Sequence, residues 1–211
     1  MNPVLRKTLA LTSLFLVSSF LGACSGFSGG FGNLGGGKSG SSTVRDSQGL
    51  TFQTQYPIQA YQFTDINTAD VYLTDLTDDE LAAFFTESRD WSQITGTIVQ
   101  VHLFLKPKPG RTPIEPTAAS VAIRWVVITQ GEIGVYDGAG FMLPGGNITK
   151  DSISGTVRNA PLRLTRRTPR FSDPLITPEM NIRFATKLDV QSAAELASRA
   201  EALAARATST R

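Results

Sequence analysis

The sequence predicts a mainly β protein: a single antiparallel β-sandwich-like domain with one short inserted helix and a C-terminal helix. Two observations lead to this fold class. Several segments alternate strictly between apolar and polar residues, and turn signals separate them at short intervals without regular helical patterns in between. We assign residues 50–190 to the β domain and 191–211 to the C-terminal helix and tail.

The N-terminal residues have the composition of a secretion signal. Arg6 and Lys7 are basic, and the stretch from Leu9 to Leu21 is apolar. This apolar stretch is shorter than the roughly 20 residues that a membrane-spanning helix needs. The segment is therefore expected to direct export rather than to span a bilayer, and it is left out of the prediction of the fold.

A four-residue motif, Leu21-Gly22-Ala23-Cys24, follows the apolar stretch directly. It resembles the lipobox of bacterial lipoproteins, and the resemblance covers residues 1–24 only. It implies that residues 1–23 are a removed signal peptide and that Cys24 carries the lipid that holds the chain on a membrane of the cell envelope. Because Ser25 rather than Asp follows Cys24, the resemblance implies the outer membrane.

Residues 24–49 are expected to be the lipidated cysteine and a flexible tether, since this stretch is rich in Gly and Ser. Cys24 is the only cysteine of the chain. An intrachain disulfide is thus excluded, and the domain has to be stabilised by packing alone.

Three segments predict long strands: 95–106, 118–130 and 179–188. In each of them every second residue is apolar, which is the pattern of a strand with one buried face. The residues expected on the buried faces are Val99, Val101, Leu103 and Leu105, then Val121, Ile123, Trp125 and Val127, then Met180, Ile182, Phe184 and Leu188. The second segment is apolar on both faces except at Arg124, so we expect a central strand.

Shorter strands are predicted at 58–63, 69–74, 132–136, 153–158 and 161–167. The glycines at Gln130-Gly131, Asp137-Gly138 and 145–146 predict hairpin turns. A phosphate-binding loop is disfavoured because these glycines lack the spacing and the following helix of a dinucleotide-binding motif. The proline-containing stretches 107–116 and 168–178 are expected to be surface loops.

Two capping boxes predict the helices. Thr77 and Glu80 open a short helix near 78–89, with Asp78 and Asp79 in its first turn. Ser192 and Glu195 are expected to open the C-terminal helix, whose apolar stripe is Leu196, Ala200, Leu203 and Ala207.

Residues with catalytic chemistry are sparse. His102 is the only histidine and lies on the polar face of its strand. The G-x-S-x-G pattern of a nucleophilic serine occurs only at Gly26–Gly30, inside the Gly/Ser-rich tether and not between a strand and a helix. A zinc site is disfavoured because it needs several histidine or cysteine ligands. The acidic residues between 65 and 90 are interpreted as a solvated face rather than a calcium site. We therefore expect no enzyme activity, cofactor or metal.

The most distinctive polar feature is a group of five arginines with no acidic residue between them: Arg158, Arg163, Arg166, Arg167 and Arg170. Arginine suits bidentate contacts with carboxylates and phosphates. The run is a candidate docking site for an acidic partner, a lipid headgroup or a wall polymer. The alternatives are a solvated strand face, or pairing with the acidic 65–90 segment of the same domain.

Charge and the lack of a catalytic pattern together set the expected function. Without Arg6 and Lys7 the chain has 18 basic and 18 acidic residues, which gives no support to nucleic-acid binding. We expect a membrane-anchored, non-enzymatic envelope lipoprotein that binds a protein partner or helps assemble a complex. The alternative is a small-ligand or glycan binder that uses Trp91, and a hydrolase with a carboxylate pair comes third.

Overall fold

The computed structural model describes residues 40–65, 67–84, 90–104, 120–144 and 151–210. The strands are β1 (Gly40–Arg45), β2 (Thr51–Tyr56), β3 (Ile58–Phe63), β4 (Ala69–Thr74), β5 (Gly96–Leu103), β6 (Val121–Thr129), β7 (Glu132–Pro144), β8 (Ser152–Arg167), β9 (Glu179–Lys187) and β10 (Thr208–Ser209). The helices are α1 (Asp78–Ala83), the 3-10 helix η1 (Trp91–Gln93) and α2 (Val190–Arg206). None of the helices in these ranges is both long and apolar enough to cross a membrane.

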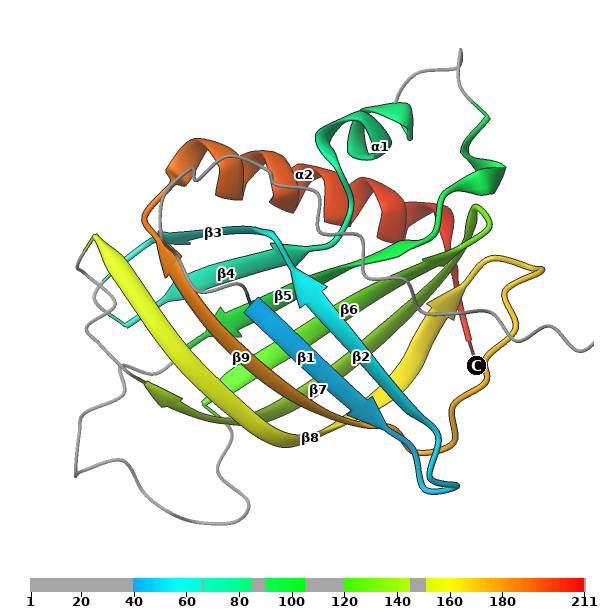
Figure 1. Ribbon diagram of the computed structural model, residues 1–211, viewed down its shortest axis with the longest axis horizontal. Coiled ribbons are helices and arrows are strands. Elements are labelled where there is room, and N and C mark those ends of the chain that lie inside the picture. The colour runs from blue at the N-terminus through cyan, green and yellow to red at the C-terminus, as the bar shows by residue number, and fades with distance from the viewer. Residues whose placement is uncertain (1–39, 66, 85–89, 105–119, 145–150, 211) are drawn as a thin grey trace, which may run out of the picture. The chain divides into compact units, whose positions relative to one another are not determined.

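The described strands form one antiparallel sheet that curves until it is nearly closed into a barrel (Figure 1). Its order is β2-β1-β9-β8-β7-β6-β5-β4-β3, and β10 pairs with β8. The strands at the two edges, β2 and β3, are separated in the chain only by Pro57. One bent segment therefore pairs with β1 before Pro57 and with β4 after it, which draws the edges together.

The three long alternating segments form strands as predicted. β5, β6 and β9 bury most of the residues expected on their inner faces, among them Val101, Ile123 and Ile182, whereas Val127 and Leu188 are half-buried. β6 lies between β5 and β7, which confirms that it is a central strand. The mainly β, antiparallel character of the domain is thus confirmed, whereas Leu105 lies outside the described residues.

The sheet begins at Gly40, inside the segment predicted to be tether. The chain there reads GSSTVR, and only Val44 in it is strongly apolar, so the sequence pattern is weak. The buried Ser42 hydroxyl compensates by bonding the Tyr56 hydroxyl at 2.7 Å. The strand is held by its pairing with both β2 and β9.

The prediction of a turn at Asp137-Gly138 is wrong, because both residues lie within β7. Gly138 is needed for a different reason: a Cβ there would lie 2.2 Å from the carbonyl oxygen of Pro161 on β8. This close approach accompanies an irregular register between the two strands. Likewise 153–158 and 161–167 are one continuous strand, β8. Gln130-Gly131 forms a turn, with positive φ angles at both residues.

The helices cover part of the outer face of the sheet (Figure 1). A second core between them and the strands contains Leu81, Phe84, Leu196 and Leu203. The Thr77 capping box is present: Glu80 N–H donates to Thr77 Oγ1, and Thr77 N–H donates to a Glu80 carboxylate oxygen.

The start of the C-terminal helix differs from the prediction. α2 begins at Val190, and its N-cap is Asp189, which accepts from the backbone N–H of Ser192 at 2.9 Å. Asp189 is a better cap than serine for this register, because its second oxygen also accepts the Ser192 hydroxyl. The predicted apolar stripe is nevertheless buried against the sheet.

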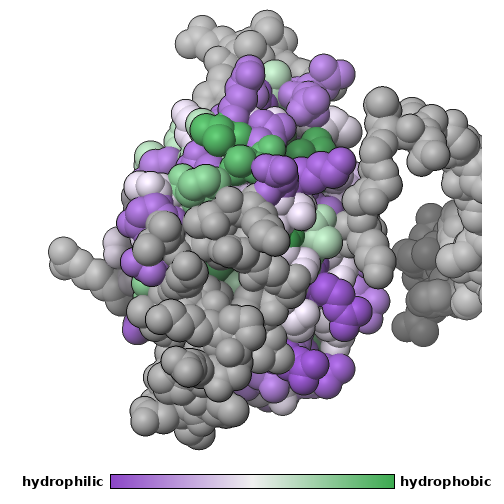
Figure 2. Space-filling view, turned by 90° about the vertical axis from the view of Figure 1, so that its left-hand side faces the viewer, coloured by the Kyte–Doolittle hydropathy of each residue, from purple (hydrophilic) through white to green (hydrophobic). Residues whose placement is uncertain are grey.

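The two ends of the curved sheet differ. At one end α2 begins, and Figure 2 looks at this end, where hydrophobic side chains lie among polar ones. Phe63, Phe104 and Val190 are exposed large hydrophobic residues there. At the other end the chain segment between β8 and β9 folds back toward the inner core. We call residues 168–178 the end segment.

Candidate functional site

A cavity of about 530 Å³ lies at the end of the sheet that carries the end segment. We call it the end cavity. Its apolar wall is formed by Phe52, Trp125, Val127, Ile128, Tyr136, Phe171, Pro174 and Leu175. Its polar lining residues include Thr54, Thr95, Thr97, Thr129, Ser172 and Asp75. None of the described residues that line it is Lys, Arg or His.

Trp125 supplies a hydrogen-bond donor that is not used. Only 5% of this residue is exposed, and its indole nitrogen Nε1 is buried without a hydrogen-bond partner among the described residues. Its ring lies 5.1 Å from that of Tyr136, the cross-strand neighbour on β7. A buried indole N–H normally finds an acceptor. Leaving it unpaired costs about 1–3 kcal/mol.

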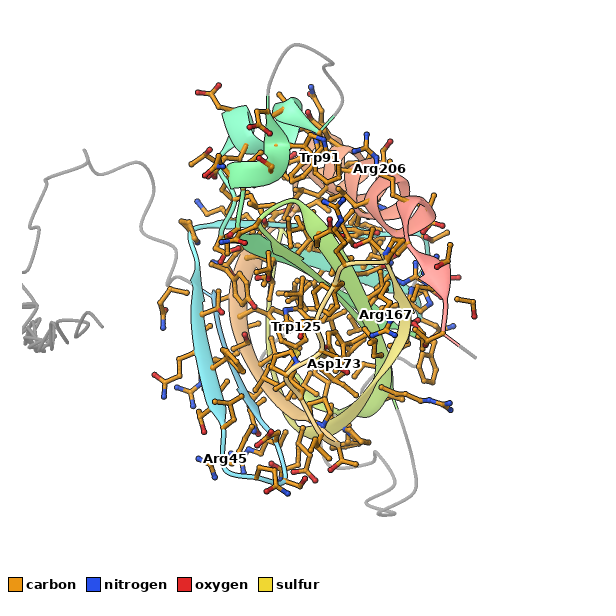
Figure 3. All side chains as sticks on the ribbon, turned by 90° about the vertical axis from the view of Figure 1, so that its right-hand side faces the viewer. Arg45, Trp91, Trp125, Arg167, Asp173 and Arg206 are labelled. Atoms are coloured by element: carbon orange, nitrogen blue, oxygen red, sulfur yellow. The ribbon has the colours of Figure 1, made fainter. Side chains whose placement is uncertain are left out.

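The end segment closes part of the cavity. Phe171 and Leu175 are buried in the inner core, so the stretch predicted as a surface loop is anchored by apolar side chains. Tyr136 OH donates to Asp173 Oδ1 at 2.5 Å, and the Leu175 N–H donates to the same oxygen at 3.0 Å. Trp125 and Asp173 lie within the curve of the sheet in Figure 3. Burial, followed by the nearby Asp173 carboxylate, raises the pKa of Tyr136, so its hydroxyl remains a donor.

Asp75 places a carboxylate in the wall of the end cavity. Its Oδ1 accepts from the Thr97 backbone N–H at 2.6 Å and from Thr97 Oγ1 at 3.2 Å. Burial nonetheless raises the pKa of Asp75 above its ordinary value of 3.8, against the lowering by these hydrogen bonds. Burial in the cavity wall therefore disfavours the charged form of Asp75, which is the only carboxylate among the described lining residues.

The raised pKa of Asp75 predicts how stability depends on pH. Between pH 3.8 and its folded pKa, the folded state holds more protons than the unfolded state, so the free energy of unfolding falls as pH rises. Asp75→Asn removes this loss, and the variant should gain stability relative to the parent as pH rises, as measured by urea unfolding. Hydrogen bonds lower the pKa of Asp189, so Asp189→Asn should show the opposite trend, losing relative stability as pH rises. A constant difference for Asp75→Asn would contradict the prediction.

A second, larger cavity of about 870 Å³ also adjoins the end segment and shares Tyr136 and Leu175 with the end cavity. Arg163 and Arg167 line it, together with Arg45, which the sequence did not single out. Neither Arg163 nor Arg167 makes an ion pair within the described residues. We call this cavity the arginine cleft. It also contains three carboxylates, those of Asp46, Asp173 and Glu179.

The other arginines of the predicted run are placed apart. Arg158 lies in a groove of β1, β8 and β9 next to Arg183. Arg166 Nη1 is 3.5 Å from the Ala204 carbonyl oxygen of α2, and Arg170 is exposed in the end segment. The five residues thus do not form one patch, because the bulges of β8 and the turn after Arg167 separate them.

Trp91 and His102, the two other singled-out side chains, lie outside both cavities. The Trp91 ring is 5.7 Å from that of Phe84, and the Arg206 guanidinium carbon lies 5.1 Å from its centre (Figure 3). His102 Nδ1 is 2.8 Å from Asp70 Oδ1. Both contacts have structural explanations, in helix packing and in a cross-strand pair between β5 and β4.

Comparison with family models, with curated proteins and with solved structures finds no match to this chain. Cys24 lies outside the described residues. The functional description therefore depends on the two cavities.

The sequence placed Trp125 correctly in the core but did not indicate the cavity beside it. The available signal was a large aromatic residue in an otherwise aliphatic strand.

Proposed function

We propose that this protein binds a small apolar ligand in the end cavity and is held in the cell envelope by lipid on Cys24. The observation that carries the proposal is the cluster of apolar and aromatic side chains, Trp125 and Phe171 among them, that lines a cavity of ligand size. A non-enzymatic role is part of the proposal, and so is the outer-membrane location implied by the lipobox resemblance.

The size and chemistry of the end cavity support this function. Ligand sites typically measure about 300–1,000 Å³ and combine apolar walls with a few polar groups that orient the ligand. The end cavity, at about 530 Å³, has eight apolar or aromatic lining residues and several hydroxyl groups. We further propose that the curved sheet acts as a barrel-like container rather than as a solid sandwich, since small barrels hold one ligand in this way.

Binding of a protein partner is a second proposal, favoured by the unpaired Arg163 and Arg167 of the arginine cleft. The three carboxylates of the cleft weaken this proposal, because their negative charge balances the positive charge of its three arginines. Cross-linking in native membranes tests it. A partner that is retained after Arg158→Glu and lost after Arg163→Glu would support docking at the cleft, and a partner retained by both variants would exclude it.

Binding of a neutral fluorescent naphthylamine to the purified full chain tests the proposed function. We expect saturable fluorescence enhancement, and we expect Val127→Trp to abolish it by filling the cavity that Val127 lines. Val190→Trp is the matched control, because Val190 is 57% exposed and lies at the end shown in Figure 2. Circular dichroism confirms that both variants fold.

Two outcomes would contradict the proposal. A fully bound probe in the Val127→Trp variant would exclude the end cavity. A loss of binding in Phe63→Ser would move the site to the exposed hydrophobic residues at the opposite end of the sheet.

A further inference from the structure

Away from both cavities, the groove on β1, β8 and β9 contains Arg158 and Arg183, and we propose that it binds a phosphate monoester group. We call it the sheet groove. Its volume is about 270 Å³. Its described lining residues are Ser41, Ser42, Thr43, Thr156, Val157, Arg158, Asn181, Ile182 and Arg183. It shares none of them with the end cavity or the arginine cleft, so this proposal is independent of the proposed function.

The polar side chains of the sheet groove lie on the outer face of the sheet. Val157 and Ile182 belong to the inner core, so the residues that alternate with them on β8 and β9 face outward. β1, β9 and β8 lie side by side, and neither α1 nor α2 covers them (Figure 1). Arg158 and Arg183 are both exposed, so a ligand in solution can reach them.

A bulge in β8 adds a residue to this face. β8 pairs with β9 at Val157 and again at Ala160, and both residues are buried in the inner core. Two residues, Arg158 and Asn159, therefore lie between two inward-facing ones, where a regular strand has only one. Both are exposed. The bulge thus directs the Arg158 side chain outward, beside the polar residues of β9.

The two guanidinium groups have no acidic counterpart in the groove. Arg183 stands opposite Thr156 on β8, and Arg158 follows two residues later on that strand. Such diagonal neighbours lie about 7–8 Å apart in a regular sheet. Neither arginine forms an ion pair within the described residues, and the described lining contains no acid. The nearest acid along β9, Glu179, stands opposite Arg45 on β1. An anion bound between Arg158 and Arg183 would relieve their repulsion.

The uncharged side chains of the groove supply further hydrogen-bond donors. Asn181 Oδ1 accepts from the Asn159 backbone N–H at 3.0 Å, which leaves the amide NH₂ group of Asn181 free to donate to a ligand. The hydroxyl groups of Ser41, Thr43 and Thr156 are also donors. Donors from three strands therefore surround the two positive charges.

This arrangement fits a doubly charged tetrahedral oxyanion better than a carboxylate. A carboxylate is satisfied by the fork of a single arginine and balances only one of the two charges. A phosphate monoester carries a charge of about −1.5 to −2 near pH 7 and presents three strong acceptor oxygens. The groove is smaller than the roughly 300–1,000 Å³ of a typical ligand pocket, so it suits a small group of this kind.

Calorimetric titration of the purified full chain at pH 7.5 tests the proposal. The ligands are glycerol 3-phosphate and, as the matched control, dimethyl phosphate, which carries a single charge. We expect saturable binding of glycerol 3-phosphate and at least about tenfold weaker binding of dimethyl phosphate, because it makes fewer charge-assisted hydrogen bonds. No saturable binding of glycerol 3-phosphate, or equal binding of the two ligands, would overturn the proposal.

Two variants connect binding to the groove. Arg158→Gln and Arg183→Gln should each weaken glycerol 3-phosphate at least about tenfold, since each removes charge-assisted hydrogen bonds. Arg170→Gln is the matched control: Arg170 is also exposed but lies outside the groove, so its loss should leave binding unchanged. Circular dichroism checks the fold of all three variants. Binding that persists in Arg158→Gln and Arg183→Gln, or an equal loss in Arg170→Gln, would refute the site.

The phosphate monoester can belong to a soluble metabolite or to a lipid headgroup, and a third ligand distinguishes these sources. Dihexanoyl phosphatidate adds two short acyl chains to glycerol 3-phosphate. Tighter binding of the phosphatidate, lost in Arg183→Gln, would identify a lipid headgroup. Equal binding of the two ligands, lost in the same variant, would identify a soluble phosphate ester.

Discussion

Gly138→Ala should lower the free energy of unfolding by about 3 kcal/mol, at the upper end of the cost of inserting a methyl group into a packed core. A Cβ at this position would lie 2.2 Å from the backbone carbonyl oxygen of Pro161. A backbone atom cannot move away by a change of rotamer, so β7 and β8 would have to separate where their register is already irregular. Urea unfolding followed by circular dichroism measures the loss.

Gly140→Ala, two residues along the same strand, is the matched control. There the new Cβ would meet side chains, at 2.9 Å from Ala160 Cβ and 3.0 Å from Val157 Cγ1. Val157 can turn away, and the contact with Ala160 Cβ is longer by 0.7 Å than the contact at Gly138, so we expect a loss of about 1 kcal/mol. Equal losses in the two variants would show that the approach of β8 to Gly138 is not the constraint described here.

Phe171→Ala should also destabilise the protein strongly, by about 3–5 kcal/mol if the end segment stays in place. Phe171 is only 5% exposed, and its ring occupies the space beside Gly134, where a Cβ would lie 2.3 Å from Phe171 Cζ. The ring also makes an edge contact with Tyr136, with centroids 6.5 Å apart. Thermal or urea unfolding gives the change in stability.

The same substitution enlarges the end cavity, because Phe171 is part of its wall. Phe52→Ala is the control: Phe52 lines the same cavity but is 40% exposed, so its loss should cost much less stability. If Phe171→Ala proved as mild as Phe52→Ala, the end segment would not be anchored through its aromatic side chain.

Much of the sheet can be predicted from the sequence, because one buried face imposes a period of two on each strand. β5, β6 and β9 have that pattern, and their inner residues are buried as expected. β1 does not have it, since its buried Ser42 depends on a hydrogen bond to a tyrosine 14 residues away. Pairing partners of this kind do not appear in a local pattern.

The candidate site was less predictable for a related reason. Trp125 was expected in the core, and it is there, but the cavity next to it depends on how the end segment folds back. Proline and polar residues in 168–178 indicated a surface loop, whereas two apolar residues, Phe171 and Leu175, anchor it. The five arginines are near in sequence and therefore suggested one docking surface. The bulges of β8 separate them, so they do not form a single patch.

The most direct test of the ligand site is the indole N–H region of a ¹H–¹⁵N NMR spectrum, recorded while methyl decanoate is added. The chain has two tryptophans, and Trp125→Phe assigns their two signals. We predict that the Trp125 indole signal shifts as the ligand fills the cavity that this residue lines, while the Trp91 signal stays in place beside Phe84 and Arg206. Binding of the ester without a change in the Trp125 signal, or with a change at Trp91 alone, would contradict the assignment of the ligand to the end cavity.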